Sequence, residues 1–177
     1  MNAVFTITAL LLFFLFIFKH KRIETKIVIN QPIEHVWQLF TCTSSHPEWN
    51  TLFALDRFPA HAGQRIIVDL YDENKNVQFQ MQPEVKELDK YRLEWEGKLY
   101  INGLFNGRHQ FVFTKIDANT TQFIQAEDFN GLLVPILNYF VIQPAQLNFE
   151  RMNQSFKQYA EIHTLGKDTC KISKIKS

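Results

Sequence analysis

The chain has 177 residues, 46% of them hydrophobic, including 17 Phe, and a formal net charge of +1 at pH 7. This length suits one domain with a large apolar core, and the near-neutral charge provides no electrostatic attraction toward nucleic acid. The two cysteines, Cys42 and Cys170, have neither the spacing of a zinc site nor the density of a disulfide scaffold. We therefore expect both to be free thiols in a reducing compartment.

Residues 1–18 carry no charged side chain and end in a continuous apolar run. As a helix they would be about 27 Å long, close to the roughly 30 Å hydrocarbon core of a bilayer. We expect a transmembrane anchor here; a buried core helix is the alternative, but it would need cover on every side. The apolar residues of the anchor are Leu10, Leu11, Leu12, Phe13, Phe14, Leu15, Phe16, Ile17 and Phe18.

A basic flank at residues 19–22 follows the apolar run, whereas a secretory signal peptide has its basic residues in front of it. By the positive-inside rule, Lys19, Lys21 and Arg22 stay in the cytoplasm. We therefore expect a single-pass protein of a bacterial inner membrane. Its N-terminus would lie outside and its soluble domain, residues 23–165, in the cytoplasm.

The soluble domain begins with one predicted strand and two predicted short helices. Residues 22–29 alternate polar and apolar side chains, which is the period of a half-buried strand. Apolar residues at helical spacing, with Pro32 near the first turn, predict a helix over residues 33–40. The small polar residues and the proline within residues 43–50 predict a tight turn or a second short helix.

A meander of strands is predicted next, because polar and apolar residues alternate over segments joined by short connections. The segments are residues 66–71, 77–88, 91–100, 105–116 and 120–129, with a weaker one at residues 52–58. After Gly131 the period becomes helical. One face of the predicted long C-terminal helix carries Ala145, Phe149, Met152, Phe156 and Ala160. The lysine-rich residues 166–177 predict a flexible tail.

This order of elements predicts an α+β domain of the helix-grip type. A curved sheet and one amphipathic helix bury their apolar faces together when the sheet wraps around the helix. We expect about six or seven antiparallel strands around the long C-terminal helix, two short helices after the first strand, and a core or cavity between sheet and helix.

Several motifs between residues 23 and 163 carry a family resemblance. They are Pro32–Trp37, Pro47–Asn50, Leu93–Gly97, Gly107–Phe111, Glu127–Pro135 and Met152–Glu161. Together they resemble the SRPBCC superfamily, also called START-like or Bet v 1-like, which includes polyketide cyclases, lipid-transfer domains and coenzyme Q binding proteins. The resemblance implies an apolar cavity and no particular reaction. The appended membrane helix does not belong to the family pattern.

The apolar pattern also predicts the register of two hairpins, because directly opposed residues of an antiparallel pair share a face. If Trp95 opposes His109 and His109 opposes Glu127, apolar residues face apolar residues along both hairpins. These three residues then form a row on the concave face, which should also carry Val85. The predicted cavity residues are Trp95, His109, Glu127, Phe111, Phe113, Phe79, Met81, Phe129, Met152 and Phe156.

A His and a Glu on an apolar wall are costly unless they meet each other or a ligand. Two interpretations of His109 and Glu127 stay open: they hydrogen-bond the polar head of an apolar ligand, or they form a structural pair. A cyclase or dehydratase could use them to relay a proton. No nucleophile elbow, phosphate loop or metalloprotease motif is present, so the interpretation leans away from an enzyme. The other histidines lack ligand spacing, so no metal is predicted, and no cofactor is expected.

The uncharged run over residues 132–142 is too short to cross a bilayer. It forms either ordinary core packing or a lid that leans on the membrane beside the cavity entrance.

We expect a membrane-anchored protein that binds or carries an apolar small molecule such as a fatty acid, phospholipid, quinone or polyketide-like compound. Its partners would be this ligand and membrane lipid, and not nucleic acid. The alternatives are a cyclase-type enzyme that uses the same cavity and a ligand-free adaptor that presents the domain to a protein at the membrane.

Overall fold

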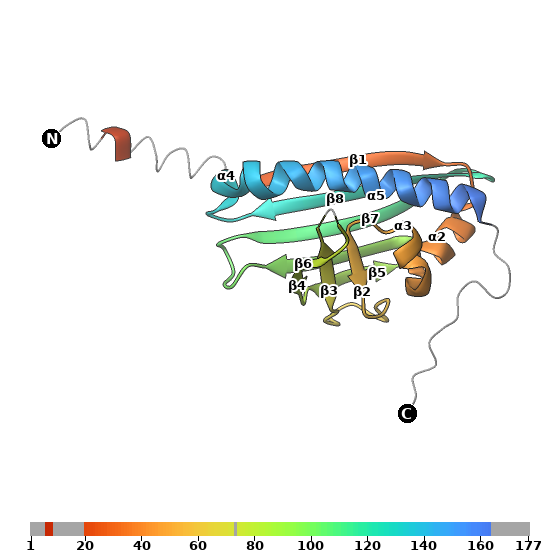
Figure 1. Cartoon of the computed structure of the whole chain (residues 1–177), viewed down its shortest axis with the longest axis horizontal. Helices are drawn as coiled ribbons and strands as arrows, with labels where there is room; N and C mark the ends of the chain where they lie inside the picture. The colour runs from red at the N-terminus through yellow and green to blue at the C-terminus, as the bar shows by residue number, and fades with distance from the viewer. Residues whose placement is uncertain (1–5, 9–19, 73, 164–177) are drawn as a thin grey trace, which may run out of the picture.

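A computed structural model describes residues 6–8, 20–72 and 74–163 of the chain (Figure 1). The strands are β1 (His20–Ile29), β2 (Phe53–Leu55), β3 (Val68–Tyr71), β4 (Val77–Met81), β5 (Glu84–Asp89), β6 (Arg92–Lys98), β7 (Asn106–Asp117) and β8 (Thr120–Asn130). The α-helices are α2 (Ile33–Thr41), α3 (His46–Trp49), α4 (Val134–Leu137) and α5 (Gln143–Ile162). A 3-10 turn, η1 (Thr43–Ser45), and a π-helical segment, η2 (Asn138–Ile142), complete the order.

The strands form two antiparallel sheets. The larger has the order β1-β8-β7-β6-β5, and the smaller has the order β2-β3-β4. The long helix α5 runs along the larger sheet at its β1 and β8 side, while α2 and α3 lie at one end (Figure 1). This arrangement confirms the predicted α+β class, the first strand, the two short helices and the long C-terminal helix.

The local sequence explains helix α2 and the aromatic core that packs against it. Helix α2 buries Ile33, Val36, Leu39 and Phe40, whose spacing of three and four residues places them on one face. It begins directly after Pro32, whose fixed φ suits a helix start. The rings of Phe40, Phe111, Phe113, Phe123 and Phe156 pack into one aromatic cluster.

The two predicted hairpin registers are confirmed. Trp95 opposes His109 in the β6–β7 pair, and His109 opposes Glu127 in the β7–β8 pair. Because opposed residues share a face, all three side chains project from the same side of the sheet. The apolar matching of side chains is therefore enough to predict the register from the sequence.

The prediction of one strand over residues 77–88, within a single sheet, is wrong. The segment divides into β4 and β5, which belong to different sheets, and the fold has eight strands in the part of the chain that is described. Pro83 lies at the break, where its missing N–H and fixed φ interrupt a ladder. Val85 therefore lies beside Trp95 in the large sheet, whereas Phe79 and Met81 come from the small one.

The predicted anchor lies outside the described residues except for residues 6–8, and the predicted tail lies outside them entirely. No helix within the described ranges is long and apolar enough to cross a membrane. Cys42 is buried and disulfide-bonded, so the expectation of a free thiol at this position is wrong. The other cysteine, Cys170, lies outside the described residues.

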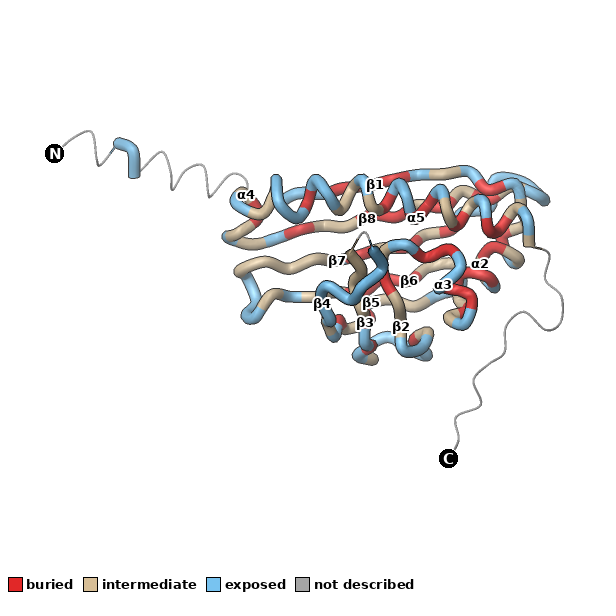
Figure 2. Tube along the Cα trace, viewed as in Figure 1, coloured by how far each residue is buried: buried red, intermediate tan, exposed pale blue. Residues whose placement is uncertain are grey.

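Burial is uneven along the fold. Buried residues concentrate in α2, along the central strands and on one face of α5, whereas α4 and the loop after β6 are mostly exposed or half-buried (Figure 2). The main core cluster surrounds Phe40, and a second, smaller cluster contains Ile23, Phe129, Val134, Ile142 and Phe149. The candidate site lies on the side of the molecule where the smaller cluster packs.

Candidate ligand cavity

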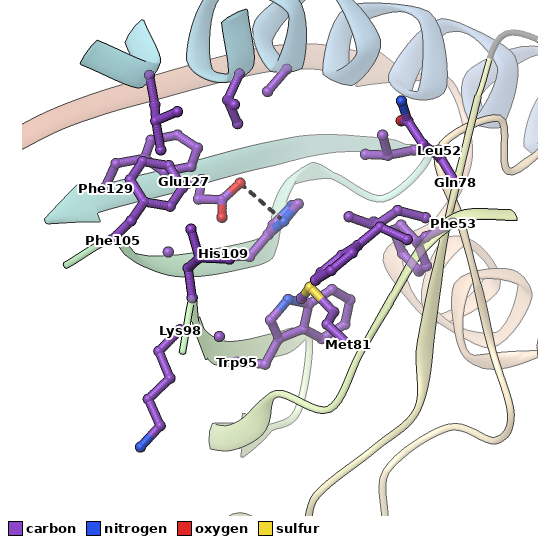
Figure 3. Close-up of a pocket in the computed structure, with 18 of the residues that line it drawn as sticks. Leu52, Phe53, Gln78, Met81, Trp95, Lys98, Phe105, His109, Glu127 and Phe129 are labelled. Atoms are coloured by element: carbon purple, nitrogen blue, oxygen red, sulfur yellow. Dashed lines mark ion pairs between the residues drawn. The ribbon is translucent and has the colours of Figure 1, made fainter. Parts of the chain in front are cut away.

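A cavity of about 440 Å³ opens between the two sheets and the segment that leads into α5. Its walls are predominantly apolar, and Figure 3 shows Trp95, Met81, Phe105 and Phe129 around it. The lining comprises Leu52, Phe53, Leu70, Gln78, Phe79, Met81, Trp95, Gly97, Lys98, Leu99, Phe105, Gly107, His109, Glu127, Phe129, Leu137, Val141, Ala145 and Phe149. Its size and apolar walls are typical of small-molecule sites.

Two glycines create the free volume on the strand floor. Gly97 and Gly107 oppose each other in the β6–β7 pair, next to Trp95 and His109, which are large. A Cβ atom on Gly107 would collide with the carboxyl oxygen Oε1 of Glu127, and one on Gly97 would come within 3.3 Å of the Met81 methyl carbon. Glycine at these positions therefore leaves room both for the Glu127 carboxyl and for a ligand above the sheet.

His109 and Glu127 form the polar spot of the cavity. His109 Nδ1 lies 3.6 Å from Glu127 Oε2, which is too long for a direct hydrogen bond (Figure 3). On its other side, His109 Nε2 lies 3.0 Å from the side-chain nitrogen of Gln125. If that amide donates, Nε2 accepts and the ring proton resides on Nδ1, which faces Glu127.

Aromatic rings hold the imidazole of His109 in place. It stacks on Phe111, with ring centroids 4.4 Å apart and an interplanar angle of 17°, and its centroid lies 4.7 Å from that of Phe149. Trp95 packs against it from β6. These apolar neighbours remove water from the ring and leave it little rotational freedom.

Burial shifts both titrating groups toward their neutral forms. It lowers the pKa of His109 to about 3 and, with a smaller contribution from neighbouring Asp128, raises the pKa of Glu127 to about 8. At neutral pH the imidazole is therefore uncharged and the carboxyl is protonated. The two groups form a neutral polar pair rather than an ion pair.

Six of the ten predicted cavity residues line the cavity: Trp95, His109, Glu127, Phe79, Met81 and Phe129. The other four, Phe111, Phe113, Met152 and Phe156, do not; all are at most 4% exposed and pack in the main core. The strand and helix periods correctly placed them on inward faces. The aromatic cluster around Phe40 then fills the space at that end of the sheet and leaves none for a ligand.

Sequence reasoning missed the part of the cavity cover that the small sheet provides, although it offered the apolar run over residues 132–142 as a lid. Leu52, Phe53 and Leu70 come from the small sheet and its approach, and Leu137 and Val141 come from the apolar run before α5. Periodicity can assign such residues to an inward face, but it cannot predict which separate sheet closes over that face. The paired glycines were a usable signal, because their predicted register put both on the concave face beside Trp95 and His109.

The uncharged run over residues 132–142 is partly buried and partly exposed. Val134 and Ile142 are buried, and Leu137 and Val141 line the cavity. Leu132, Ile136 and Phe140 are more than half exposed. The segment therefore closes the cavity with some of its side chains and presents others to the surroundings.

A second exposed apolar segment adjoins the first. Tyr100 and Ile101 lie in the loop after β6, which bonds to the turn after β8 through Leu132 N to Gly103 O at 3.0 Å and Leu133 N to Leu104 O at 2.9 Å. We call the exposed side chains of the two segments the apolar rim. The rim comprises Tyr100, Ile101, Leu132, Ile136, Tyr139 and Phe140.

No protein-family model and no curated protein matches the chain. Solved structures are similar to it. A hypothetical protein from Helicobacter pylori has a TM-score of 0.63 at 15% identity, covering 79% of this chain and 88% of its own. A START superfamily protein from Mycobacterium smegmatis has a TM-score of 0.60 at 11% identity, with coverages of 79% and 97%.

Norcoclaurine synthase from Thalictrum flavum, solved in complex with dopamine and hydroxybenzaldehyde, is similar at a TM-score of 0.60 and 8% identity. The likeness covers 83% of this chain and 90% of the synthase. Identities this low establish likeness of fold and nothing finer. The chain therefore has the helix-grip fold found in START-like and Bet v 1-like proteins.

Proposed function

We propose that the protein binds and carries an apolar small molecule in this cavity and exchanges it at a membrane. The observation that carries the proposal is the cavity itself: about 440 Å³ of predominantly apolar space, with one neutral polar pair inside and an opening on the surface. A structural core would have filled this volume, because protein interiors pack close to the density of organic crystals.

The direct test is native mass spectrometry, with organic extraction, of the full chain isolated with its surrounding lipid. We expect a discrete apolar compound bound to the wild type. The matched variant is Gly97→Val, which adds a side chain to the cavity floor and displaces the flexible end of Met81, whose methyl carbon would lie 3.3 Å from the new Cβ atom. It should lose the compound while keeping its melting temperature within a few degrees. An empty wild type, or equal occupancy of Gly97→Val, would contradict the proposal.

Two features support exchange at a membrane. The apolar rim lies beside the cavity, because its two segments also contribute Leu99, Phe105, Leu137 and Val141 to the lining. His20, where the described part of the domain begins, pairs with Asn130 at the end of β8. The expected anchor, residues 1–18, thus joins the domain at the same end as the rim. We include that anchor, and a cytoplasmic domain, in the proposal.

Brominated phospholipids test the membrane contact in proteoliposomes of the full chain, because they quench only tryptophan that lies near the acyl chains. Phe140 is 79% exposed within the rim. Ile116 is 53% exposed near the other end of β7 and serves as the control position. We expect the added fluorescence of Phe140→Trp to be quenched and that of Ile116→Trp to be spared. Equal quenching at both positions would contradict the proposed contact between the apolar rim and the membrane.

A cyclase-type enzyme is the second candidate, favoured by the chain of polar groups from Gln125 through His109 to Glu127 inside an apolar site. Such a chain could move a proton at a bound carbonyl compound. Turnover of a polyketide-like substrate that disappears in His109→Ala would support it. A cavity that stays empty across preparations, without turnover, would instead favour the ligand-free adaptor.

A further inference from the structure

Few of the described residues that line the cavity carry an ionisable side chain. Among the described lining residues, the ionisable side chains are Lys98, His109 and Glu127. The side chain of Lys98 is exposed and its amine points away from the cavity (Figure 3). The facing segment from η2 and α5 contributes Val141, Ala145 and Phe149, which do not titrate. No cation of the described chain therefore points into the cavity to compensate a negatively charged ligand head.

The carboxyl of Glu127 lies among apolar groups and has no strong partner. Among the described residues its neighbours are the His109 ring, 3.6 Å away, and the backbone of Gly107 beneath it. Asp128, the next residue, projects to the opposite face, where its carboxylate pairs with Arg22. Arg22 is therefore engaged on the outer face. The side chain of Glu127 is 17% exposed, so it retains contact with the cavity space.

A carboxyl group in these surroundings is a hydrogen-bond donor. Burial raises its pKa to about 8, so at neutral pH it holds a proton that it can donate to a ligand oxygen. The Nδ1–H of His109 is a second donor on the same side when Gln125 donates to Nε2. Two neutral donors suit a carbonyl or hydroxyl oxygen. They do not offset the desolvation of a carboxylate or phosphate, whose burial costs far more.

We propose that the cavity selects apolar molecules whose polar head is an uncharged carbonyl or hydroxyl group, bound at Glu127 and His109, and that it excludes fatty-acid anions and phosphate heads. This inference rests on the proposed carrier function and narrows its ligand class to ketones, quinone-like compounds, esters or alcohols. It selects among the ligand classes that the sequence left open.

The test compares two probes of equal chain length, a long-chain methyl ketone and the corresponding fatty-acid anion, by titration calorimetry on the full chain at pH 6.5. We expect the ketone to bind roughly tenfold or more tightly, because the anion loses its hydration without a compensating cation. The ketone affinity should fall as pH rises through about 8, where Glu127 loses the proton it donates.

Two variants make the result specific to Glu127. Glu127→Leu should lower the ketone affinity toward that of the alkane of the same length. Glu127→Gln should abolish the pH dependence, because an amide does not titrate in this range. Equal or tighter binding of the anion, or an unchanged pH profile in Glu127→Gln, would overturn the inference. If neither the probes nor the alkane bind the wild type, the carrier function itself fails, which is a different outcome.

Discussion

At the scale of single residues, the fold places polar groups where burial decides their charge. Burial lowers the pKa of His46 to about 4, and the ring is held through Nε2 by the Phe40 carbonyl oxygen at 2.8 Å. His109 and Glu127 are shifted in opposite directions by the same cause, and both become neutral. The protein therefore couples its stability to pH through three inward-facing side chains.

The first prediction concerns that coupling. Below pH 6.5 the unfolded chain binds protons on His46 and His109 that the folded protein does not, so stability rises with pH. From pH 4.5 to about 8 the folded protein keeps a proton on Glu127 that the unfolded chain releases, so this group lowers stability as pH rises. The two histidines outweigh the one carboxyl below pH 6.5, and the effect of Glu127 exceeds their declining contribution above it.

Stability should therefore be greatest near pH 6.5 and fall by about 1 kcal/mol toward pH 8, because the two histidines offset part of the roughly 1.4 kcal/mol per pH unit that Glu127 costs. Urea unfolding at the two pH values measures this difference. Glu127→Gln should remove the fall, because it cannot release a proton. A fall of the same size in the variant would assign the effect to other groups.

The second prediction concerns Glu94, on the opposite face of the sheet from the cavity. Its side chain is 1% exposed and pairs with Arg92 and Arg108. Glu94→Gln weakens both contacts and should lower the free energy of unfolding by about 1–3 kcal/mol. The control is Glu87→Gln, which removes a 43% exposed partner of Arg92 and should cost less than about 1 kcal/mol. Equal losses in urea unfolding would show that burial of Glu94 is immaterial.

At the scale of elements, the cavity depends on the turn between β8 and α4. Gly131 has φ +133°, and a Cβ atom there would collide with the backbone oxygen of Leu104. The turn and the loop after β6 are thus in direct backbone contact, reinforced by the bonds of Leu132 and Leu133. Both rim segments are held together at this contact.

The third prediction is that Gly131→Ala destabilises the fold by about 1–3 kcal/mol and weakens ligand binding, because it strains the backbone and forces the two segments apart. Gly63→Ala is the matched control: Gly63 also has a positive φ, +84°, but nothing lies within 4 Å of its Cβ position. Gly63→Ala should introduce the backbone strain without a steric collision, and it should leave ligand binding unchanged. Thermal unfolding and probe titration of both variants make the comparison, and equal effects would refute it.

At the scale of the whole molecule, one side is filled and the other is open. The aromatic cluster around Phe40 occupies the space between α2, α5 and the sheet. On the other side of His109, the opposed glycines have no side chains to fill the space beneath the small sheet, and the cavity lies there. Stability and binding therefore depend on different residues of one continuous fold.

The fourth prediction tests this division. Phe156→Ala removes a fully buried ring from the cluster and should cost about 3–5 kcal/mol in urea unfolding. Because Phe156 does not line the cavity, the affinity for the ketone probe should change less than threefold, on the order of 0.6 kcal/mol. A loss of affinity comparable to that of Glu127→Leu would mean that the cluster and the cavity are coupled.

The class of fold, the order of nearly all elements and the register of the central hairpins could be predicted from the sequence. Periodicity identifies inward faces locally, and matching apolar positions, such as Leu93 with Phe111 and Phe113 with Phe123, admits one register. The candidate polar pair was predictable for the same reason, because a His and a Glu on an apolar face contradict its pattern.

Which part of the volume between the sheets and α5 is filled, and which part stays empty, could not be predicted from the sequence. Phe111 and Phe129 lie on inward faces of neighbouring strands, yet one packs in the core and the other lines the cavity. The difference arises because Pro83 sends β4 into a separate sheet over Gly97 and Gly107, while α2 brings Phe40 against Phe111. Which part of the volume is filled depends on contacts between segments that are distant in the sequence. Local sequence patterns do not encode these contacts.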